Sequence, residues 1–307
     1  MQGSIVEITH ELYVIVAGEF PLCNSIVVMS DQVSVVDPGC RLEDLRAFLS
    51  SKNLEQSDID NVIISHIHPD HITHAARLKR VSDCKIWANK ITAPLFNDKE
   101  KMKRFLGFHP GHKIRPFWEA MVNEKMYGAL DESEVDFVLT DGERFSLGGI
   151  EAATLFTPGH TPDHMCIEFP DSNYLFAADI DCTDFGPYYG HPNSSIDDFR
   201  RSISLLTSRS YEALISGHLL EPLVKDYVSA LKSYQLHFDL REDFVLMRIS
   251  KGAHTMDEIV EEPIIYKSLS GFVQLQFERW MIEHHLDSLI QKEMIREEKG
   301  TYTKIRA

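Results

Sequence analysis

A short segment between an apolar run and a predicted helix combines the residue types that bind metal ions. It reads Ser-His-Ile-His-Pro-Asp-His and spans residues 65–71. His66 and His68 lie two residues apart at the end of a predicted strand, so their imidazoles point the same way and can share one metal ion. Asp70 and His71 begin the next helix, where consecutive side chains diverge, and they suit a second ion nearby. Three histidines and one aspartate within six residues favour a metal site over a cluster of surface histidines.

Three later residues could complete the site, because each follows a predicted strand. His160 follows the run 150–156, Asp179 follows 174–178 and His218 follows 211–215. Ligands in layered α/β proteins collect just beyond strand ends. The sequence therefore predicts two metal ions with nitrogen and oxygen ligands: His66, His68 and His160 on the first, and Asp70, His71 and His218 on the second. Asp179 would bridge the two ions, because a carboxylate has two oxygens.

Two strand-rich blocks must position these residues. The first block contains the apolar runs Leu12–Ala17, Ser25–Met29, Val33–Val36, Val62–Ser65 and Lys85–Ala88. The second contains Phe137–Leu139, Arg144–Leu147, Ile150–Phe156, Met165–Phe169, Tyr174–Ala177 and Tyr211–Ser216. Apolar residues at helical spacing predict helices over Leu42–Leu49, Asp70–Lys79 and Ile196–Leu206. Two β-rich halves, each followed by helices, indicate a layered α/β fold.

Two segments of mixed composition are placed to wall the site. Residues 97–128 combine aromatic and charged side chains, and we expect short helices that lie over one face and form an apolar lid. The segment 183–192 follows Asp179 closely and is rich in Gly, Pro and aromatic residues. Its Tyr188, Tyr189 and His191 are candidates for substrate contact or for stabilising an oxyanion. A surface loop with packed aromatic residues is an equal alternative for this segment.

The charge and cysteine content narrow the class of partner. The chain has 307 residues, with 31 Lys+Arg against 47 Asp+Glu and a formal net charge of −16. Such a charge opposes binding to nucleic acid or anionic membranes, so we expect a small-molecule substrate. No apolar run approaches the roughly 18 residues of a membrane helix, and the first ten residues lack the Lys or Arg of a secretion signal. Five cysteines without a CxxC pair indicate reduced thiols, and we predict a cytoplasmic protein.

The C-terminal residues form a predicted helical region of near-neutral charge. Helices are expected from Leu223 to about Ile249 and over Thr255–Glu261, Phe272–Trp280 and Ile282–Lys292, followed by a turn at 298–301. Residues 241–307 contain 10 Lys/Arg and 12 Asp/Glu, a net charge of −2. Such a surface predicts weak nucleic-acid binding, with a Kd no better than about 10⁻⁴–10⁻⁶ M. The region could equally line the catalytic pocket or form a homo-oligomer.

The ordered set of motifs resembles the metallo-β-lactamase superfamily of dinuclear hydrolases. The resemblance covers Ile5 to His218, and it includes Asp37 in the segment Val-Val-Asp-Pro-Gly, which matches the family's first motif. It implies an αββα sandwich over residues 1–222, with Asp37 supporting the metal ligands through hydrogen bonds. Two positions depart from the family pattern: Ser216 stands where proline is common, and His74 where glycine is common. We expect His74 to be an exposed helical side chain.

A second motif points to one branch of this family. The segment 157–165, Thr-Pro-Gly-His-Thr-Pro-Asp-His-Met, is similar to the β-lactamase-like protein 2 branch of the glyoxalase II-like hydrolases. Members of that branch carry a C-terminal winged helix, and some cleave single-stranded RNA. The resemblance therefore implies a small helical, winged-helix-like domain over residues 223–307. His164 is expected to support the site through hydrogen bonds rather than to bind metal.

The ligand types and the resemblance together predict a dinuclear, metal-dependent hydrolase. Two divalent ions would share a bridging water and lower its pKa from about 16 toward about 7, which gives hydroxide at neutral pH. Asp70 and Asp179 would orient this nucleophile as catalytic carboxylates. Zinc is the favoured metal, with iron and manganese as alternatives.

The substrate class follows from the leaving group. We expect a small thioester or ester, because a thiolate leaves without protonation and the sequence offers no clear general acid. Two alternatives stand beside this hypothesis: an endoribonuclease of the β-lactamase-like type, and a metal-containing signalling or binding protein whose hydrolase activity is incidental. A basic channel beside the metals would favour the ribonuclease, and a closed aromatic pocket would favour the esterase.

Overall fold

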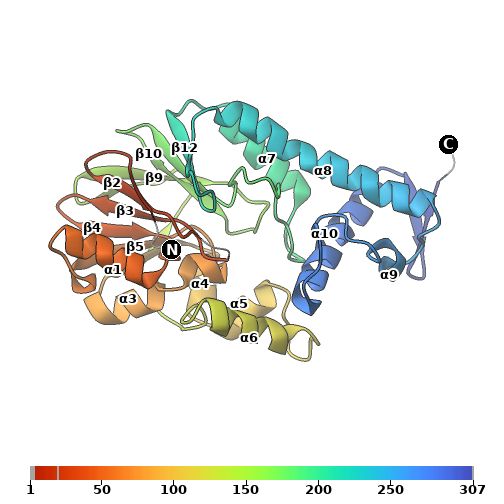
Figure 1. Ribbon diagram of the computed structural model, residues 1–307, viewed down its shortest axis with the longest axis horizontal. Helices are drawn as coiled ribbons and strands as arrows, with labels where there is room; N and C mark the ends of the chain where they lie inside the picture. Colours follow the sequence, from red (N-terminus) through yellow and green to blue (C-terminus); the bar gives the residue numbers. More distant parts are fainter. Residues whose placement is uncertain (1–3, 19–20, 306–307) are drawn as a thin grey trace.

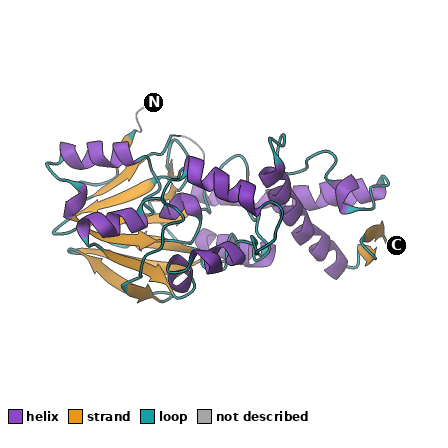
Figure 2. Cartoon of the chain, turned by 90° about the horizontal axis from the view of Figure 1, so that it is seen from below, coloured by secondary structure: helices purple, strands orange, loops and turns teal. Residues whose placement is uncertain are grey.

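Two β-sheets packed face to face form the centre of the molecule, and helices cover both outer faces (Figures 1 and 2). The computed structural model describes residues 4–18 and 21–305. Within them, the first sheet has the strand order β1 (Ile5–Glu7), β2 (Leu12–Ile15), β3 (Ser25–Met29), β4 (Val33–Val36), β5 (Ile59–Ile64), β6 (Lys85–Asn89) and β7 (Phe137–Leu139). Strands β1 to β4 are antiparallel, whereas β4 to β7 are parallel.

The second sheet is mostly antiparallel. Its strand order is β13 (Leu223–Val224), β12 (Ala213–Ser216), β11 (Tyr174–Ala178), β10 (Met165–Phe169), β9 (Ile150–Phe156) and β8 (Arg144–Leu147). Only β11 and β12 run parallel among these described strands.

Residues between the sheets explain why the strands appear in the sequence as continuous apolar runs. Leu12 and Val14 of β2 belong to a buried cluster with Ile167 of the second sheet. Their neighbours Tyr13 and Ile15 belong to the cluster under the outer helices, because side chains alternate between the two faces of a strand. Both faces are therefore buried. The predicted αββα sandwich is confirmed.

The helices divide between the two outer faces. The first sheet is covered by α1 (Leu42–Ser51), α2 (Pro69–Ile72), α3 (Ala75–Ser82), α4 (Thr92–Phe96), α5 (Lys99–Phe105) and α6 (Arg115–Lys125). The second sheet is covered by α7 (Ile196–Thr207) and the start of α8 (Tyr227–Ser250) (Figure 1). The short helices expected within residues 97–128 are present as α5 and α6.

The prediction of one helix over residues 70–79 is wrong, because the helix is interrupted between α2 and α3. His74 lies at the break, where its backbone N–H donates to the carbonyl of Pro38 and its Nε2 lies 3.1 Å from the carbonyl oxygen of Cys40. These contacts join the break to the turn after β4. His74 is therefore partly buried and hydrogen-bonded, and it is not the exposed helical side chain that we expected.

The C-terminal region consists of helices and a hairpin that project beyond the sandwich (Figure 1). After α8 come α9 (Met256–Ile259), α10 (Phe272–Gln291), β14 (Ile295–Glu298) and β15 (Thr301–Lys304). Residues 223 and 224 pair with β12 instead of beginning a helix. The two helices predicted over 272–292 are one helix, because the buried Met281 continues its apolar face without a Gly or Pro break.

One apolar cluster joins this region to the sandwich. Phe199 of α7, Phe238 of α8 and Leu286 of α10 are buried in the same cluster as Leu175 of β11. The helical character of the region is as expected, whereas its winged-helix identity and the boundary at residue 222 stay predictions. No helix within residues 4–18 and 21–305 is long and apolar enough to cross a membrane.

Candidate metal centre

Four strand ends bring predicted ligands together at one edge of the sandwich. Asp37 follows β4, His66 and His68 follow β5, Asp179 follows β11, and His218 follows β12. Each pair of strands is parallel, so their carboxyl ends meet at the same edge. The backbone hydrogen bonds of the sheets thus fix the Cα positions of these residues.

The turn after β4 packs directly on α2, which carries Asp70. Asp37 adopts φ +48°, in the left-handed region that non-glycine residues rarely occupy. A Cβ at Gly39 would lie 1.8 Å from the carbonyl oxygen of Asp70, so only glycine fits there. The Asp-Pro-Gly sequence therefore allows a close approach that a larger residue would prevent.

One group of donor atoms contains three imidazoles and a carboxylate. His160 Nε2 lies 2.8 Å from His68 Nδ1 and 3.2 Å from His66 Nε2. Asp179 Oδ2 lies 3.1 Å from His160 Nε2 and 4.0 Å from His66 Nε2. Three ring nitrogens that face one another at these distances need a positive charge between their lone pairs. A metal ion with nitrogen ligands meets that need.

A second group lies on the other side of the same carboxylate. Asp179 Oδ1 lies 2.8 Å from His71 Nε2 and 3.2 Å from His218 Nε2. Asp70 Oδ2 lies 3.6 Å from each of these two nitrogens. Asp179 therefore presents one oxygen to each group, which is the arrangement that a bridging ligand requires.

Three histidines of the cluster are oriented by hydrogen bonds through their outer nitrogens. His66 Nδ1 lies 2.9 Å from Ser65 Oγ, and His160 Nδ1 lies 2.8 Å from the carbonyl oxygen of Tyr188. His71 Nδ1 lies 2.7 Å from Asp37 Oδ2. In each ring this contact leaves Nε2 as the atom that faces the cluster, as is usual for metal-binding histidines.

Both carboxylate oxygens of Asp37 accept hydrogen bonds from residues at the cluster. Its side chain is fully buried and accepts hydrogen bonds from the backbone N–H and the hydroxyl of Ser65, in addition to the contact with His71. Asp37 could also join His66 and His71 as a ligand group by distance alone. Because its oxygens already have partners, we assign it the supporting role that the sequence predicted.

Two further buried residues hold the loops in place. His164 Nε2 accepts the backbone N–H of Asp179 at 3.2 Å, so its Nδ1 carries the proton and donates to the carbonyl of Thr157. Asp163 Oδ2 accepts the backbone N–H of Ile67 at 2.8 Å, between the two histidines of the first motif. His164 thus has the hydrogen-bonding position that we expected.

Burial and charge move the pKa values of the cluster in opposite directions. Burial would raise the pKa of Asp179, but the neighbouring histidines, His71 foremost, hold it well below its usual range. Burial would lower the pKa of His71, but Cys23, Asp179 and Asp70 raise it well above its usual range. Burial also lowers the pKa of His66, which leaves a neutral ring with a free lone pair. His66 therefore offers a free lone pair to a cation, whereas His71 is held as a proton donor beside the Asp179 carboxylate, and a divalent cation at this position would take the place of its proton.

A cavity of about 520 Å³ opens on the cluster. Asp70, Asp179 and His218 line one end of it. The remaining wall is mainly apolar and aromatic, and includes Leu22, Leu106, Trp118, Met121, Val122, Met126, Phe185, Tyr188, Tyr266 and Phe277. No lysine or arginine occurs among the described residues that line it. The residues from α6 form the wall that we expected from the insertion.

A comparison with protein families decides the class of this site. A sequence model of the Metallo-beta-lactamase superfamily matches residues 18–218, a span that contains every predicted metal ligand. The chain belongs to the metallo-beta-lactamase superfamily. It is therefore a metal-dependent hydrolase, which is the class that this superfamily comprises.

Relatives of this superfamily member are similar at low sequence identity. The structure of a metallo-beta-lactamase family protein from Thermus thermophilus has a TM-score of 0.76 at 18% identity and covers 97% of this chain and 100% of that one, which shows the shared fold. The lactamase-like protein nscB of Trichophyton verrucosum is 25% identical over 186 residues, 58% of this chain and 62% of that protein. A hydroxyacylglutathione hydrolase of Rhodopseudomonas palustris (strain BisB18) is 28% identical over 121 residues, 39% of this chain and 33% of that enzyme. The chain thus spans less than two thirds of either curated relative.

Of the three residues predicted to contact the substrate of this hydrolase, the structure places two at the cavity and one away from it. Tyr188 and His191 line the cavity. Burial raises the pKa of Tyr188 well above its usual value, so its hydroxyl stays protonated and can donate a hydrogen bond. The prediction for Tyr189 is wrong, because its ring is fully buried and its hydroxyl lies 2.6 Å from His285 Nε2, away from the cavity.

The structure supports only one of the two roles predicted for His191, contact with a substrate. Burial lowers its pKa to about 3, so the ring is neutral. Its Nδ1 donates to the carbonyl of Leu106 at 2.9 Å. Only Nε2 is left for a substrate, and it is an acceptor. His191 can therefore contact a substrate, but it does not stabilise an oxyanion as a donor.

Several site residues were missed at the sequence level. Asp181 lines the cavity two residues after Asp179, and the close spacing of the acidic residues at 179, 181 and 184 could have drawn attention to it. Tyr266 and Phe277 come from the C-terminal region, and no motif around them signals a site. They are found only because the fold brings α10 against the cavity.

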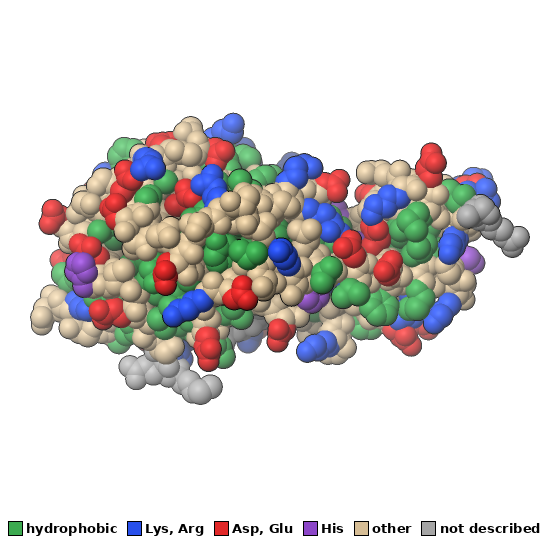
Figure 3. All heavy atoms as spheres, turned by 90° about the horizontal axis from the view of Figure 1, so that it is seen from above, with side chains coloured by type: hydrophobic (Ala, Val, Ile, Leu, Met, Phe, Trp, Pro, Cys, Tyr) green, Lys and Arg blue, Asp and Glu red, His purple; other side chains and the backbone are tan. Residues whose placement is uncertain are grey.

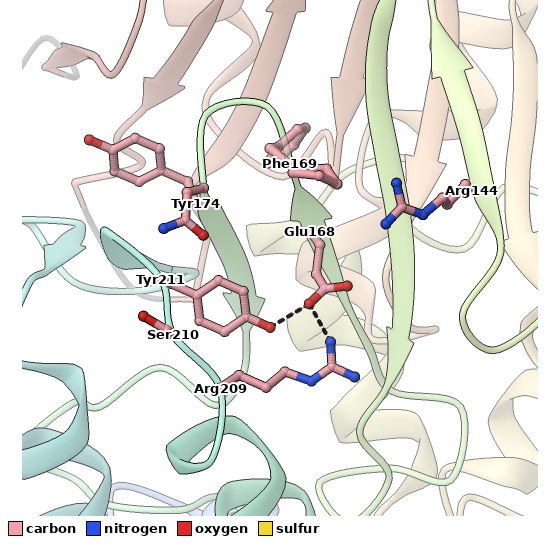
Figure 4. A pocket seen from close by; sticks show the side chains of 9 residues that line it. Arg144, Glu168, Phe169, Tyr174, Arg209, Ser210 and Tyr211 are labelled. Carbon is pink, nitrogen blue, oxygen red and sulfur yellow. Dashed lines mark hydrogen bonds and ion pairs between the residues drawn. The ribbon is translucent and has the colours of Figure 1, made fainter.

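A second pocket, of about 370 Å³, lies at the other end of the second sheet (Figure 4). Glu168 accepts a hydrogen bond from Tyr211 at 2.5 Å and from Arg209 at 2.7 Å there. Tyr174 at the start of β11 lines this pocket, whereas Asp179 follows the end of β11, so about 16 Å separates the two sites. Arg209 pairs with Glu168 in this pocket and Arg144 pairs with Glu151 beside it, and the pocket takes no part in the metal cluster.

Proposed function

We propose that this metallo-beta-lactamase superfamily member is a dinuclear hydrolase of a small thioester or ester. The observation that carries the proposal is the cavity itself, which has carboxylates and imidazoles at one end and an apolar wall around the rest. A scissile carbonyl at the polar end would place the rest of a small acyl compound against that wall. Binding sites for small molecules usually combine a few polar groups with an apolar lining in this way.

We assign the metal ligands from the two donor groups. His66, His68 and His160 would hold one ion, Asp70, His71 and His218 would hold the other, and Asp179 would bridge them. Zinc suits these nitrogen and carboxylate ligands, with iron and manganese as alternatives. Divalent cations in such a site supply Lewis acidity, which activates a water molecule and polarises a carbonyl oxygen.

The residues of the chain itself would orient the reaction. Asp70 and Asp179 place carboxylate oxygens at the cavity end. There they can accept a hydrogen bond from the attacking water and so fix its orientation. The hydroxyl of Tyr188 is held protonated by burial, which raises its pKa, and can donate to the oxyanion that develops on the carbonyl. The apolar wall limits the access of bulk water to the bound acyl group.

The choice of a thioester rests on the leaving group. A thiolate departs without a proton, whereas an amide nitrogen needs a strong proton donor. His191 is neutral and presents only an acceptor to the cavity, so it does not supply that proton. The relative named hydroxyacylglutathione hydrolase supports this substrate class.

The ribonuclease alternative lacks the basic surface that it needs. RNA binding depends on Lys and Arg beside the phosphates, and the described residues of the cavity contain neither. On the face shown in Figure 3, acidic and basic side chains are interspersed and form no continuous basic stripe. A small-molecule substrate agrees with both observations.

The five cysteines support a reducing compartment. All of them are free thiols, and Cys23, Cys40, Cys84 and Cys166 are buried. Free buried thiols are typical of cytoplasmic proteins, so we propose a cytoplasmic location.

One panel of substrates tests the proposed function. Zinc-loaded protein is assayed with acyl-CoA, a glutathione thioester, a lactone and single-stranded RNA under identical conditions. We expect thioester hydrolysis that is lost on chelation and in His68→Ala. Faster cleavage of RNA than of every thioester would contradict the proposal, and metal content without turnover on any substrate would favour the binding-protein alternative.

A further inference from the structure

One wall of the cavity is built by the C-terminal region. Tyr266 precedes α10 and Phe277 lies within it, and both line the cavity that contains Asp179. The Phe277 ring centroid lies 5.8 Å from that of Tyr188, and the Tyr266 ring centroid lies 5.2 Å from that of Phe185. Two aromatic side chains of the C-terminal region thus face two aromatic side chains of the loop after Asp179.

A buried carboxylate fixes the position of Tyr266. Glu278 has no exposed surface, and its Oε1 accepts the backbone N–H groups of Ile264 at 2.6 Å and Ile265 at 3.0 Å. Its Oε2 accepts the backbone N–H of Tyr266 at 3.1 Å. A buried carboxylate is tolerated only where hydrogen bonds replace its hydration. These three bonds therefore hold the segment 264–266 in one position against the cavity.

The facing loop is fixed from the same region. Arg241 of α8 donates through Nη1 to the carbonyl of Pro187 at 2.6 Å and through Nη2 to the carbonyl of Phe185. Both aromatic sides of this wall thus depend on charged residues of the C-terminal helices. The wall is pre-formed, so a substrate group meets fixed aromatic surfaces.

The geometry also indicates which part of the substrate faces this wall. The cavity opens near Leu220, whose side chain is 66% exposed. A polar leaving group can remain at this opening, whereas the aromatic wall offers no lysine or arginine to it among the described residues. The acyl group is the part that fits against the aromatic wall.

We propose that Tyr266 and Phe277, with Glu278 as their positioning residue, form an acyl-selective wall, and that this hydrolase prefers large apolar acyl groups to acetyl. The inference rests on the proposed thioester hydrolysis and names its acyl specificity. An acetyl group would leave most of the 520 Å³ cavity without contacts. Each methylene that is buried should raise kcat/KM roughly threefold to fourfold until the wall is reached.

A series of acyl-CoA thioesters with one leaving group tests the wall. The full-length, zinc-loaded chain is assayed with acetyl, butyryl, hexanoyl and phenylacetyl thioesters. We expect kcat/KM to rise at least about tenfold from acetyl to hexanoyl or phenylacetyl. Phe277→Ala should lower the hexanoyl-to-acetyl ratio about tenfold, mainly through KM. An unchanged ratio in Phe277→Ala, or a flat profile in the wild type, overturns the proposal.

The positioning role of Glu278 has its own variant. Glu278→Gln keeps one acceptor oxygen for Ile264 and Ile265 but turns an amide donor toward the N–H of Tyr266. We expect a threefold or larger loss of acyl preference, with the change in KM rather than kcat. Glu258→Gln is the matched control, because Glu258 also accepts backbone N–H groups, those of His254 and Thr255, away from the cavity. Equal profiles for the two variants would remove Glu278 from the proposal.

Binding of product anions separates this inference from the proposed function. If the wild type cleaves no thioester or ester, the proposed function fails, and calorimetric titration with acetate, hexanoate and phenylacetate then decides the inference. We expect tighter binding of the two larger anions and a loss of this difference in Phe277→Ala. Equal affinity for all three anions in the wild type would overturn the wall, and far-UV circular dichroism identifies any variant that is unfolded.

Discussion

The two ends of the cavity are made in different ways. The metal end consists of polar side chains carried by strand ends, by the loop after β9 and by α2, and several of them are held by a further hydrogen bond, as His71 is by Asp37. The apolar end consists of side chains from α6, α10 and two loops, and none of its ring contacts depends on strand pairing. The sheets therefore fix the chemistry, whereas helices and loops that can vary independently shape the space for the substrate.

The largest effect is expected from the carboxylate that joins both donor groups. Asp179→Asn keeps the size of the side chain but removes the charge that faces His71 and His160. We expect bound metal to fall from about two ions per chain to one or fewer, and thioester hydrolysis to fall about a thousandfold, since the Lewis acidity of a metal is worth several kcal/mol. Elemental analysis and kinetics measure the two quantities. Two ions retained in both Asp179→Asn and His218→Ala would contradict the dinuclear assignment.

A smaller effect at the same end should follow from the supporting carboxylate. Asp37→Asn removes one of the oxygens that hold Ser65 and His71, so we expect metal affinity to fall about 10- to 100-fold. Competition with a chelator of known affinity measures the change. Asp44→Asn is the control, because Asp44 of α1 is also buried but pairs with Arg41, the residue before α1. If both variants lose metal equally, Asp37 has no special role.

At the apolar end the expected change is in stability and substrate affinity. Arg241→Met removes the buried donor to Pro187 and Phe185, and unsatisfied carbonyls should lower the free energy of unfolding by about 2–3 kcal/mol. KM for a hexanoyl thioester should rise while metal content is unchanged. Arg200→Met, which removes a partly exposed ion pair with Asp239, should change the stability by less than about 1 kcal/mol. Metal loss in Arg241→Met would show that the two ends are not independent.

The smallest expected effect concerns pH and the helix break behind the metal end. Burial lowers the pKa of His74 to about 4 from its usual 6.5. The unfolded chain therefore binds a proton that the folded chain does not, and stability should be lost as pH falls from about 6.5 to about 4. Urea unfolding with chelator present measures the free energy of unfolding at each pH. Between pH 6.5 and 4 this free energy should fall by about 1–3 kcal/mol less in His74→Gln than in the wild type. His10→Gln, at an exposed position, is the control, and identical curves for His74→Gln and wild type would contradict the assignment.

The same contrast explains what the sequence can reveal. His66 and His68 are predictable because they stand two residues apart directly after a buried strand, and Asp37 is predictable because its turn is local. Tyr189 was predicted wrongly, because spacing within a loop of adjacent aromatic residues does not determine which ring faces the cavity. Tyr266 and Phe277 were missed, because only the packing of α10 against the sandwich brings them to the site. Fold class and candidate ligands were thus accessible, whereas the substrate wall depended on tertiary contacts.

The position of Phe277 in the chain has a consequence for biosynthesis. Every predicted metal ligand has been translated once His218 is made, but the aromatic wall of the cavity needs α10, which extends to Gln291. At about 5–20 residues per second, the ribosome needs roughly 3–12 seconds to add the residues from 218 to 277. During that interval the polar cluster can assemble while its apolar side is still open. We therefore expect metal to be acquired through an open side of the nascent protein, before the C-terminal helices enclose the cavity.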